Sequence, residues 1–280
     1  MTAIHDLHSH SSASDGTQRP AALVAAARAA GVDVLALTDH DTTAGLDEAG
    51  RAAGEAGLRL IPGIELSCGW ERKTLHVLGL NIDPAARPLR EGLTELAALR
   101  TARAERIDAK LAKAGIPGLL AGLRAELGPD TQITRSRFAR ALVAGGHVNT
   151  PAAAFTRYLG RGKPAAVASD WPALAQVTSW IRAAGGVPVL AHPLRYRLTA
   201  SWLRRLLTAF VATGGQALEV VCGRGNPDEI RTLALYASRF GLAASAGSDY
   251  HGAATPWLTP GRLPPLPAGL TPVWSLWEAA

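Results

Sequence analysis

The stretch Val32-Asp33-Val34-Leu35-Ala36-Leu37-Thr38 is a compact apolar segment, and Asp39-His40-Asp41 follows it directly. A short apolar run bounded by polar residues is typical of a buried β-strand. Upstream, Pro20 begins an alanine-rich segment that extends to about Ala30, as expected for a helix with proline in its first turn. The sequence therefore predicts a helix followed by a buried strand, with a histidine just after the strand's C-terminal end.

The same alternation of strands and helices occurs on both sides of this stretch. We expect strands at residues 3–8, 58–64, 74–82, 187–191, 217–221 and 242–246, and helices at residues 43–56, 172–185, 201–213 and 228–240. The tail from Pro256 onward is rich in proline, and we expect it to be irregular. Repeated βα units predict an α/β fold with a parallel sheet, either open or closed into a barrel.

Residues 88–164 break this alternation. Residues 89–114 are expected to form one long amphipathic helix, and glycine and proline interrupt the shorter helices that follow. Residues 88–164 contain thirteen Lys and Arg against six Asp and Glu, a net charge of +7, whereas the whole chain carries +6. We interpret them as a basic helical insertion, with residues 1–87 and 165–280 forming the barrel domain. The basic charge fits either an anionic substrate or a solvated helical surface.

The bulk composition excludes several classes of protein. Hydrophobic residues make up 48% of the chain, which is enough for a sizeable core and argues against disorder. No apolar run is long enough to span a bilayer, and no basic start precedes an apolar stretch as in a signal peptide. The two cysteines, Cys68 and Cys222, are too few for a zinc–thiolate site, and we expect reduced thiols in a cytoplasmic protein without a membrane partner.

Six of the eight histidines lie in short polar motifs at the ends of predicted strands. The motifs are Asp6-Leu7-His8-Ser9-His10, Ser14-Asp15-Gly16, Thr38-Asp39-His40-Asp41, Gly63-Ile64-Glu65-Leu66-Ser67, Leu75-His76-Val77, Ala191-His192-Pro193 and Ser248-Asp249-Tyr250-His251. Side chains alternate between the faces of a strand, so the two residues of each H-x-H or D-x-H pair point the same way. In parallel barrels the C-terminal strand ends form the reactive face.

Nine residues of these motifs are predicted to bind metal ions: His8, His10, Asp15, His40, Glu65, His76, His192, Asp249 and His251. Taken singly, each has a structural explanation, such as a turn at Asp15 or a buried imidazole at His192. Taken together they predict a metal centre. Nitrogen and oxygen ligands without thiolate suit Mn²⁺, Zn²⁺ or Fe²⁺, and this many ligands implies about two or three ions. Clustered divalent ions hydrolyse phosphate esters by activating water and by neutralising phosphoryl oxygens.

The motif series resembles that of the PHP (polymerase and histidinol phosphatase) superfamily over most of the chain. It is most similar to the single-chain phosphoesterases with a helical insertion, a group that includes 3′,5′-nucleoside bisphosphate phosphatases and a 5′→3′ exoribonuclease. The resemblance implies a distorted (β/α)₇ barrel with a trinuclear site, and manganese as the expected metal. The ligand sets it implies are His8, His10, Glu65 and Asp249; Asp15, His40 and His192; and Glu65, His76 and His251.

The resemblance also suggests residues for catalysis and for substrate binding. Glu65, Asp249 and His192 are expected at the catalytic centre, with Glu65 bridging two ions. Arg135, Lys163 and Arg195 are candidates for binding phosphate, because cationic side chains, and guanidinium above all, pair with phosphate oxygens. Each of these three is also compatible with ordinary solvated surface. Asp6, Asp39 and Asp41 are expected to orient the histidine ligands.

The function predicted from the sequence is hydrolysis of the 3′-linked phosphate of a 5′-phosphorylated nucleotide by a metal-activated water. The substrate would be a small 3′,5′-bisphosphate or short RNA attacked from its 5′ end, with no obligate protein partner evident. One alternative is a histidinol phosphatase, against which the basic insertion favours a larger anionic substrate. The other is a non-enzymatic PHP scaffold, against which the intact ligand set argues.

Overall fold

The computed structural model describes residues 3–128, 131–252 and 258–278. The chain divides into two compact units, one made of Met1–Leu93 with Pro172–Ala280 and the other of Thr94–Trp171. The predicted insertion, residues 88–164, overlaps the second unit, which begins and ends a few residues later in the sequence. The assignment of residues 88–164 as an insertion stays a prediction.

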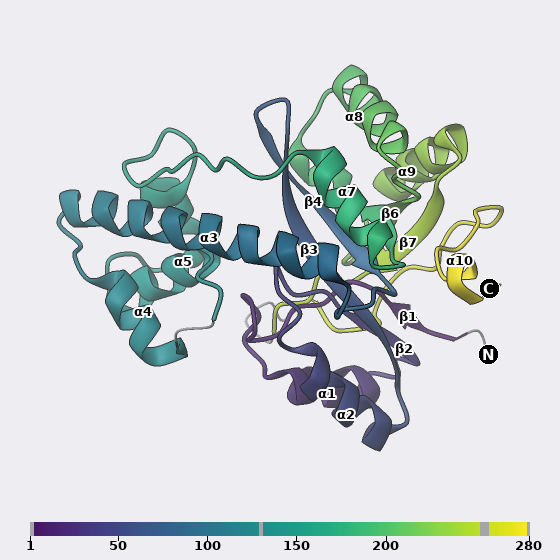
Figure 1. Cartoon of the computed structure of the whole chain (residues 1–280), viewed down its shortest axis with the longest axis horizontal. Helices are drawn as coiled ribbons and strands as arrows, with labels where there is room; N and C mark the ends of the chain where they lie inside the picture. The colour runs from purple at the N-terminus through teal and green to yellow at the C-terminus, as the bar shows by residue number, and fades with distance from the viewer. Residues whose placement is uncertain (1–2, 129–130, 253–257, 279–280) are drawn as a thin grey trace. The chain divides into compact units, whose positions relative to one another are not determined.

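The first unit is built on seven strands that follow one another in sequence order around a barrel (Figure 1). They are β1 (His5–Asp6), β2 (Val34–Leu37), β3 (Arg59–Trp70), β4 (Lys73–Leu80), β5 (Val187–Leu190), β6 (Ala217–Cys222) and β7 (Ala243–Gly247). The barrel closes where β7 lies beside β1, since the Leu7 nitrogen donates to the Ala246 oxygen at 3.0 Å. The predicted distorted (β/α)₇ barrel is confirmed.

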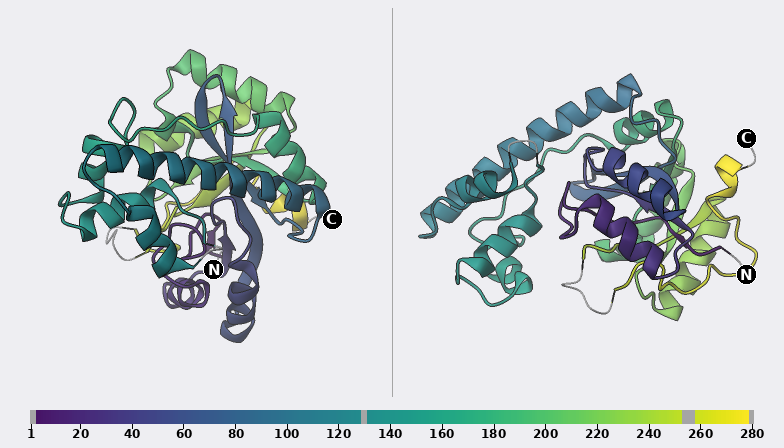
Figure 2. Two further views of the ribbon diagram at one scale, coloured as in Figure 1. Left: turned by 60° about the vertical axis from the view of Figure 1, so that its left-hand side comes forward. Right: turned by 90° about the horizontal axis from the view of Figure 1, so that it is seen from below.

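One strand, β4, departs from the expected parallel arrangement, because it pairs antiparallel with both β3 and β5. No helix separates β3 from β4. The connection is a two-residue turn in which Glu71 (φ 46°) and Arg72 (φ 61°) both have left-handed backbone. Turns of this kind usually contain glycine or asparagine, so the sequence carries no signal for it. The resulting hairpin is long and extends past the other strands (Figures 1 and 2).

Helices cover the outside of the barrel. They are α1 (Pro20–Ala29), α2 (Leu46–Ala56), α7 (Leu174–Ala183), α8 (Ala200–Ala212) and α9 (Pro227–Phe240). Figure 1 shows α1 packed along α2, and α8 along α9. The strand β2 shows how the layers are specified: Leu35 and Leu37 pack in the cluster under α1 and α2, whereas Val34 and Ala36 belong to the barrel interior. This two-residue period is the one expected for a strand between two apolar layers.

The C-terminal segment returns to the start of the barrel. Its last described helix, α10 (Ser275–Glu278), is labelled in Figure 1. The helix follows Trp274, whose ring stacks on that of His5 with centroids 3.9 Å apart. The predicted irregular tail therefore contains one short helix, and parts of the tail, residues 256–257 and 279–280, lie outside the described residues. Cys68 and Cys222 are free thiols. Within the described residues no helix is both long and apolar enough to cross a membrane.

The second unit is helical and has an apolar core of its own. It contains most of α3 (Arg87–Lys113), together with α4 (Leu119–Leu127), α5 (Arg135–Ala144), α6 (Pro151–Ala154) and η1 (Phe155–Leu159). Phe138, Leu111 and Leu142 are fully buried at the centre of this core. The helix α5 begins at a Thr134 N-cap, whose side-chain oxygen accepts a hydrogen bond from the Arg137 nitrogen at 3.3 Å.

Candidate metal centre

The end of β1 brings two imidazoles together, as the H-x-H spacing predicts. The Nε2 atoms of His8 and His10 lie 3.1 Å apart, and both side chains are buried. The Asp249 Oδ1 atom lies 3.4 Å from His8 Nε2 and 3.2 Å from His10 Nε2. Asp249 follows β7 and has left-handed backbone (φ 52°), with its nitrogen donating to the His8 oxygen at 2.8 Å. Closure of the barrel thus places these three potential ligands around one point.

A second group forms around the loop that follows β1. The Asp15 Oδ1 atom lies 3.2 Å from Nε2 of His251 and 3.9 Å from Nε2 of His40. The Thr17 nitrogen donates to the His251 oxygen at 2.9 Å, which ties this loop to the segment after β7. Residues from the ends of β1, β2 and β7 therefore meet here, because β1 has the other two strands as its neighbours in the barrel.

Glu65, on β3, lies at the centre of the cluster. Its side chain is buried, and its two oxygens face different histidines. Oε1 is 3.0 Å from His76 Nδ1 and 3.0 Å from His192 Nε2. Oε2 is 3.1 Å from His40 Nδ1, 3.2 Å from His10 Nε2 and 3.3 Å from His8 Nε2. A carboxylate with this surrounding can bridge two metal ions.

All nine predicted ligands therefore lie in one cluster, and their assignment to individual metal ions stays a prediction. The ligand atoms within 4.8 Å of one another form the sets His8, His10 and Asp249; His10, Asp15, His40 and His251; and His40, Glu65 and His76. His251 thus lies with Asp15, and His192 lies beside Glu65, whereas the resemblance had implied His192 with Asp15 and His251 with Glu65. The order of the strands explains this placement, since β5, which His192 follows, adjoins β4 with His76.

The donor set fits divalent metal ions. Among the described residues, the buried side-chain atoms without a hydrogen-bond partner include His10 Nδ1, His40 Nδ1, Glu65 Oε2, His76 Nδ1 and His192 Nδ1. Each such buried polar atom costs about 1–3 kcal/mol when it is left unsatisfied. These atoms belong to the same ligand cluster as the Nε2 atoms of His8 and His10, which lie 3.1 Å apart. Coordination of cations would satisfy imidazole nitrogens and carboxylate oxygens that the protein itself leaves unpaired.

Protonation in this cluster follows from burial and from the neighbouring charges. Burial opposes ionisation of Glu65, but the surrounding histidines, His40 and His8 first, hold its pKa well below the usual value. Burial lowers the pKa of His40 well below its usual value despite the nearby carboxylates. Burial also opposes protonation of His10, but Asp249 and Glu65 overcome this and raise its pKa to about 10. The carboxylates are therefore ionised, and the cluster retains protons that bound cations would displace.

A tenth residue, Glu219 on β6, was missed by sequence reasoning. It is fully buried, and His8 Nδ1 donates to its Oε1 at 2.8 Å while the His192 nitrogen donates to its Oε2 at 2.6 Å. This arrangement keeps the proton of His8 on Nδ1 and leaves Nε2 free to face Asp249 and His10. The available signal was a lone carboxylate within the apolar strand Ala217–Cys222.

The three aspartates expected to orient histidines accept hydrogen bonds from the backbone of the ligand-bearing loops. The carboxylates of Asp39, Asp41 and Asp6 accept hydrogen bonds from the backbone nitrogens of Ser11 (2.8 Å), Ser67 (2.7 Å) and Ser248 (2.8 Å), respectively. In addition, Asp39 accepts from the Ser14 hydroxyl at 2.5 Å. Asp6 also accepts a hydrogen bond from the His8 nitrogen at 3.5 Å, and the expectation that these three residues orient the histidines stays a prediction.

The three candidates for binding phosphate lie in different places. Arg195, in η2 (Pro193–Tyr196), forms an ion pair with Asp249 and is half exposed, so it borders the ligand cluster. Arg135 and Lys163 belong to the second unit and are exposed. The Arg135 guanidinium lies 5.7 Å from the centre of the Phe155 ring. A role for Arg135 and Lys163 in binding substrate stays a prediction.

Comparisons with known proteins agree with this geometry. A model of the PHP domain matches residues 6–113. A 5′-3′ exoribonuclease of Haemophilus influenzae is 44% identical over 275 residues, which cover 98% of this chain and 99% of that protein. The chain belongs to the PHP family. A 3′,5′-nucleoside bisphosphate phosphatase of Chromobacterium violaceum is 40% identical, with 98% of this chain and 96% of the relative covered. The PHP resemblance expected from the motifs is confirmed.

Solved structures of two similar proteins match almost the whole molecule. A protein of Chromobacterium violaceum, named as an amidohydrolase with bound sulfate and no metal, superimposes with a TM-score of 0.93 at 40% identity, covering 99% of this chain and 96% of that one. A protein of Bifidobacterium adolescentis, named as a metal-dependent phosphoesterase, has a TM-score of 0.83 at 32% identity, with the same coverage. The fold and the ligand cluster described above thus belong to a PHP protein.

Proposed function

We propose that this PHP protein hydrolyses the 3′-linked phosphate ester of 5′-phosphorylated nucleotides at a cluster of about two or three divalent ions. The observation that carries the proposal is the convergence of five imidazoles on the two oxygens of Glu65, inside a cluster that contains two further carboxylates. The relatives named above, an exoribonuclease and a nucleoside bisphosphate phosphatase, supply the substrate class. Manganese is the metal we propose for this set of nitrogen and oxygen ligands.

The chain's own residues have distinct roles in this chemistry. A divalent centre held by the nine ligands would supply a water of lowered pKa and would neutralise the phosphoryl oxygens. Glu65 and Asp249 would supply negative charge to the bound cations, and Glu219 fixes the orientation of His8. Arg195, beside Asp249, is positioned to contact a phosphate oxygen at the edge of the cluster. In the reaction, water adds to phosphorus, the P–O3′ bond breaks and the 3′ oxygen leaves with a proton.

The two candidate substrates are alike at their first nucleotide. Each has a 5′-phosphate and a phosphate ester on the 3′ oxygen. Hydrolysis of a 3′,5′-bisphosphate yields a 5′-mononucleotide and inorganic phosphate, whereas RNA yields a 5′-mononucleotide and a strand with a new 5′-phosphate. We propose that Arg135 and Lys163 bind the 5′-phosphate. Such remote binding raises kcat as well as affinity, because it fixes the reacting ester in place.

The test compares adenosine 3′,5′-bisphosphate with adenosine 3′-monophosphate in the presence of Mn²⁺. We expect the bisphosphate to react at least about a hundred times faster, because remote binding energy contributes to catalysis. Arg135→Ala and Lys163→Ala should each lower the ratio of the rate on the bisphosphate to the rate on the monophosphate. Arg106→Ala, which removes an exposed arginine from α3 in the same unit, should leave this ratio of rates unchanged. Equal rates on the two compounds, or release of the 5′-phosphate, would contradict the proposal, and preferred hydrolysis of histidinol phosphate would favour the alternative.

A further inference from the structure

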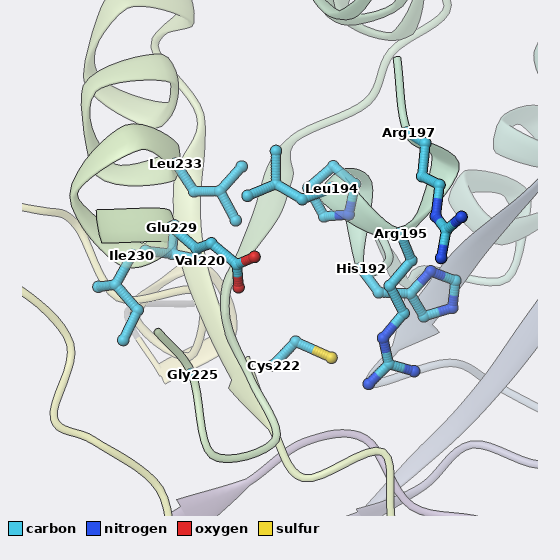
Figure 3. Close-up of a pocket in the computed structure, with 11 residues that line it drawn as sticks. His192, Leu194, Arg195, Arg197, Val220, Cys222, Gly225, Glu229, Ile230 and Leu233 are labelled. Carbon is cyan, nitrogen blue, oxygen red and sulfur yellow. The ribbon is translucent and has the colours of Figure 1, made fainter. Parts of the chain in front are cut away.

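A cavity of about 440 Å³ lies next to the metal centre in the first unit, between η2 and the N-terminal half of α9 (Figure 3). Volumes of this size are typical of sites for small organic ligands. The ligand cluster and the cavity share His192, and Arg195 lines the cavity while pairing with Asp249. The cavity therefore begins where a phosphate at the metal centre would lie.

The two sides of this cavity differ in chemistry. Figure 3 shows His192, Arg195 and Arg197 together on one side, and Ile230, Leu233 and Glu229 on the other. Leu194 points across the space toward Leu233, so that apolar side chains approach from both sides. Such walls suit the flat faces of a heterocyclic base, which other nucleotide-processing sites hold between apolar side chains.

Two charged side chains, Arg197 and Glu229, line the cavity. Among the residues that the structure describes, neither the Arg197 guanidinium nor the Glu229 carboxylate has a hydrogen-bond or ion-pair partner. Both are exposed, and Figure 3 shows the Glu229 carboxylate pointing toward the middle of the cavity. A free carboxylate can accept a hydrogen bond from a base amino group, and a free guanidinium can donate hydrogen bonds to the ring nitrogens of a base or stack on its face.

We propose that this cavity binds the second nucleotide of an RNA substrate, the one whose 5′ oxygen carries the phosphate under attack. This assignment rests on the proposed function. A 3′,5′-bisphosphate ends at the attacked phosphate, whereas RNA continues from it, and the cavity offers a place for that continuation directly beside the metal centre. In the hydrolysis of a 5′-phosphorylated dinucleotide, the P–O3′ bond breaks, the first nucleoside keeps its 3′ oxygen with a proton, and the phosphate stays on the second nucleoside.

The experiment measures kcat/KM for a 5′-phosphorylated adenylyl dinucleotide and for adenosine 3′,5′-bisphosphate, in Mn²⁺ and at fixed salt. The quantity of interest is the ratio of the two values. Arg197→Ala should lower this ratio about tenfold, the size expected for loss of one charge-assisted hydrogen bond. Glu229→Trp, which fills the cavity from an exposed position at the start of α9, should lower it further. Arg204→Ala removes the same charge from an exposed position on α8 and should leave the ratio unchanged.

The possible outcomes distinguish failure of the cavity assignment from failure of the proposed function. A ratio that falls in both cavity variants, with the control unchanged, supports the assignment. If wild-type protein hydrolyses both compounds but the variants keep the wild-type ratio, the cavity does not bind the second nucleotide. An equal loss of kcat/KM on both compounds would also overturn the assignment, since the cavity would then bind the first nucleotide or its 3′-linked phosphate, which both substrates contain. Wild-type protein that hydrolyses neither compound would contradict the proposed function itself, and the cavity assignment with it.

Discussion

Replacement of Glu219 by glutamine tests whether the buried carboxylate of β6 sets the geometry of the metal centre. Both of its oxygens accept hydrogen bonds, one from His8 Nδ1 at 2.8 Å and one from the His192 nitrogen at 2.6 Å. Glutamine has the same shape but only one oxygen, so its amino group must face one of these two donors. Glu219→Gln therefore removes one buried charge-assisted hydrogen bond and places two donors against each other.

The size of the effect follows from this loss. A hydrogen bond to a charged group contributes about 1.5–3 kcal/mol, and an unpaired buried donor adds to the cost. Removal of a residue that orients a metal-binding histidine typically weakens metal affinity by about 10–100-fold, which corresponds to about 1.4–2.7 kcal/mol. The two figures agree, so we expect Mn²⁺ affinity to fall within this range.

The assay is calorimetric titration of chelator-treated protein with Mn²⁺, for wild type and for Glu219→Gln. Glu55→Gln is the matched control, since it removes the same charge from an exposed position on α2. Thermal unfolding in chelator shows whether the variant is folded before metal is added. A folded Glu219→Gln variant that binds Mn²⁺ with wild-type affinity would refute the reasoning, because His8 would then need no carboxylate partner.

Three further predictions concern the same site and its charge. The Glu65→Gln variant should bind at least one ion fewer, by metal analysis, and its kcat should fall by orders of magnitude. Near-normal turnover would show that Glu65 is not a ligand. The pKa of His10 is raised to about 10, so this ring is protonated at neutral pH without metal. Binding of Mn²⁺ should therefore release protons and become tighter as pH rises. Calorimetry in buffers of different ionisation enthalpy measures the release, and none is expected if His10 is not a ligand. The +7 charge of residues 88–164 should make kcat/KM fall with added salt, more steeply for RNA than for a small bisphosphate. If kcat/KM does not change with salt for either substrate, this charge does not contribute to substrate binding.

The sequence was informative wherever a ligand stands at a strand end. Apolar strands such as Val34–Leu37 are short and bounded by polar residues, so their C-terminal ends can be located to within a residue or two. A residue such as His40 then falls on the reactive face of any barrel built from them. This explains why ligands that follow a strand, such as His40, lie in the cluster, whereas Glu65 and His76 reach it from within β3 and β4.

What the sequence did not provide depends on contacts between distant segments. The partners of His192 and His251 are decided by which strands are neighbours in the closed barrel, and a motif carries no such information. Glu219 was missed because its role depends on a contact with His8, which is 211 residues away in the sequence. The β3–β4 hairpin was missed because Glu71 and Arg72 adopt left-handed backbone without glycine or asparagine, so the tertiary fold overrides the local preference.

The most direct test of the account is a titration of metal-free protein with Mn²⁺, in which phosphate release from adenosine 3′,5′-bisphosphate and the number of bound ions are followed together. We expect no turnover without metal and activity that saturates at about two or three ions per chain, as the number of ligands requires. Full turnover by metal-free protein would contradict the central claim that the cluster around Glu65 is a metal centre for phosphate ester hydrolysis.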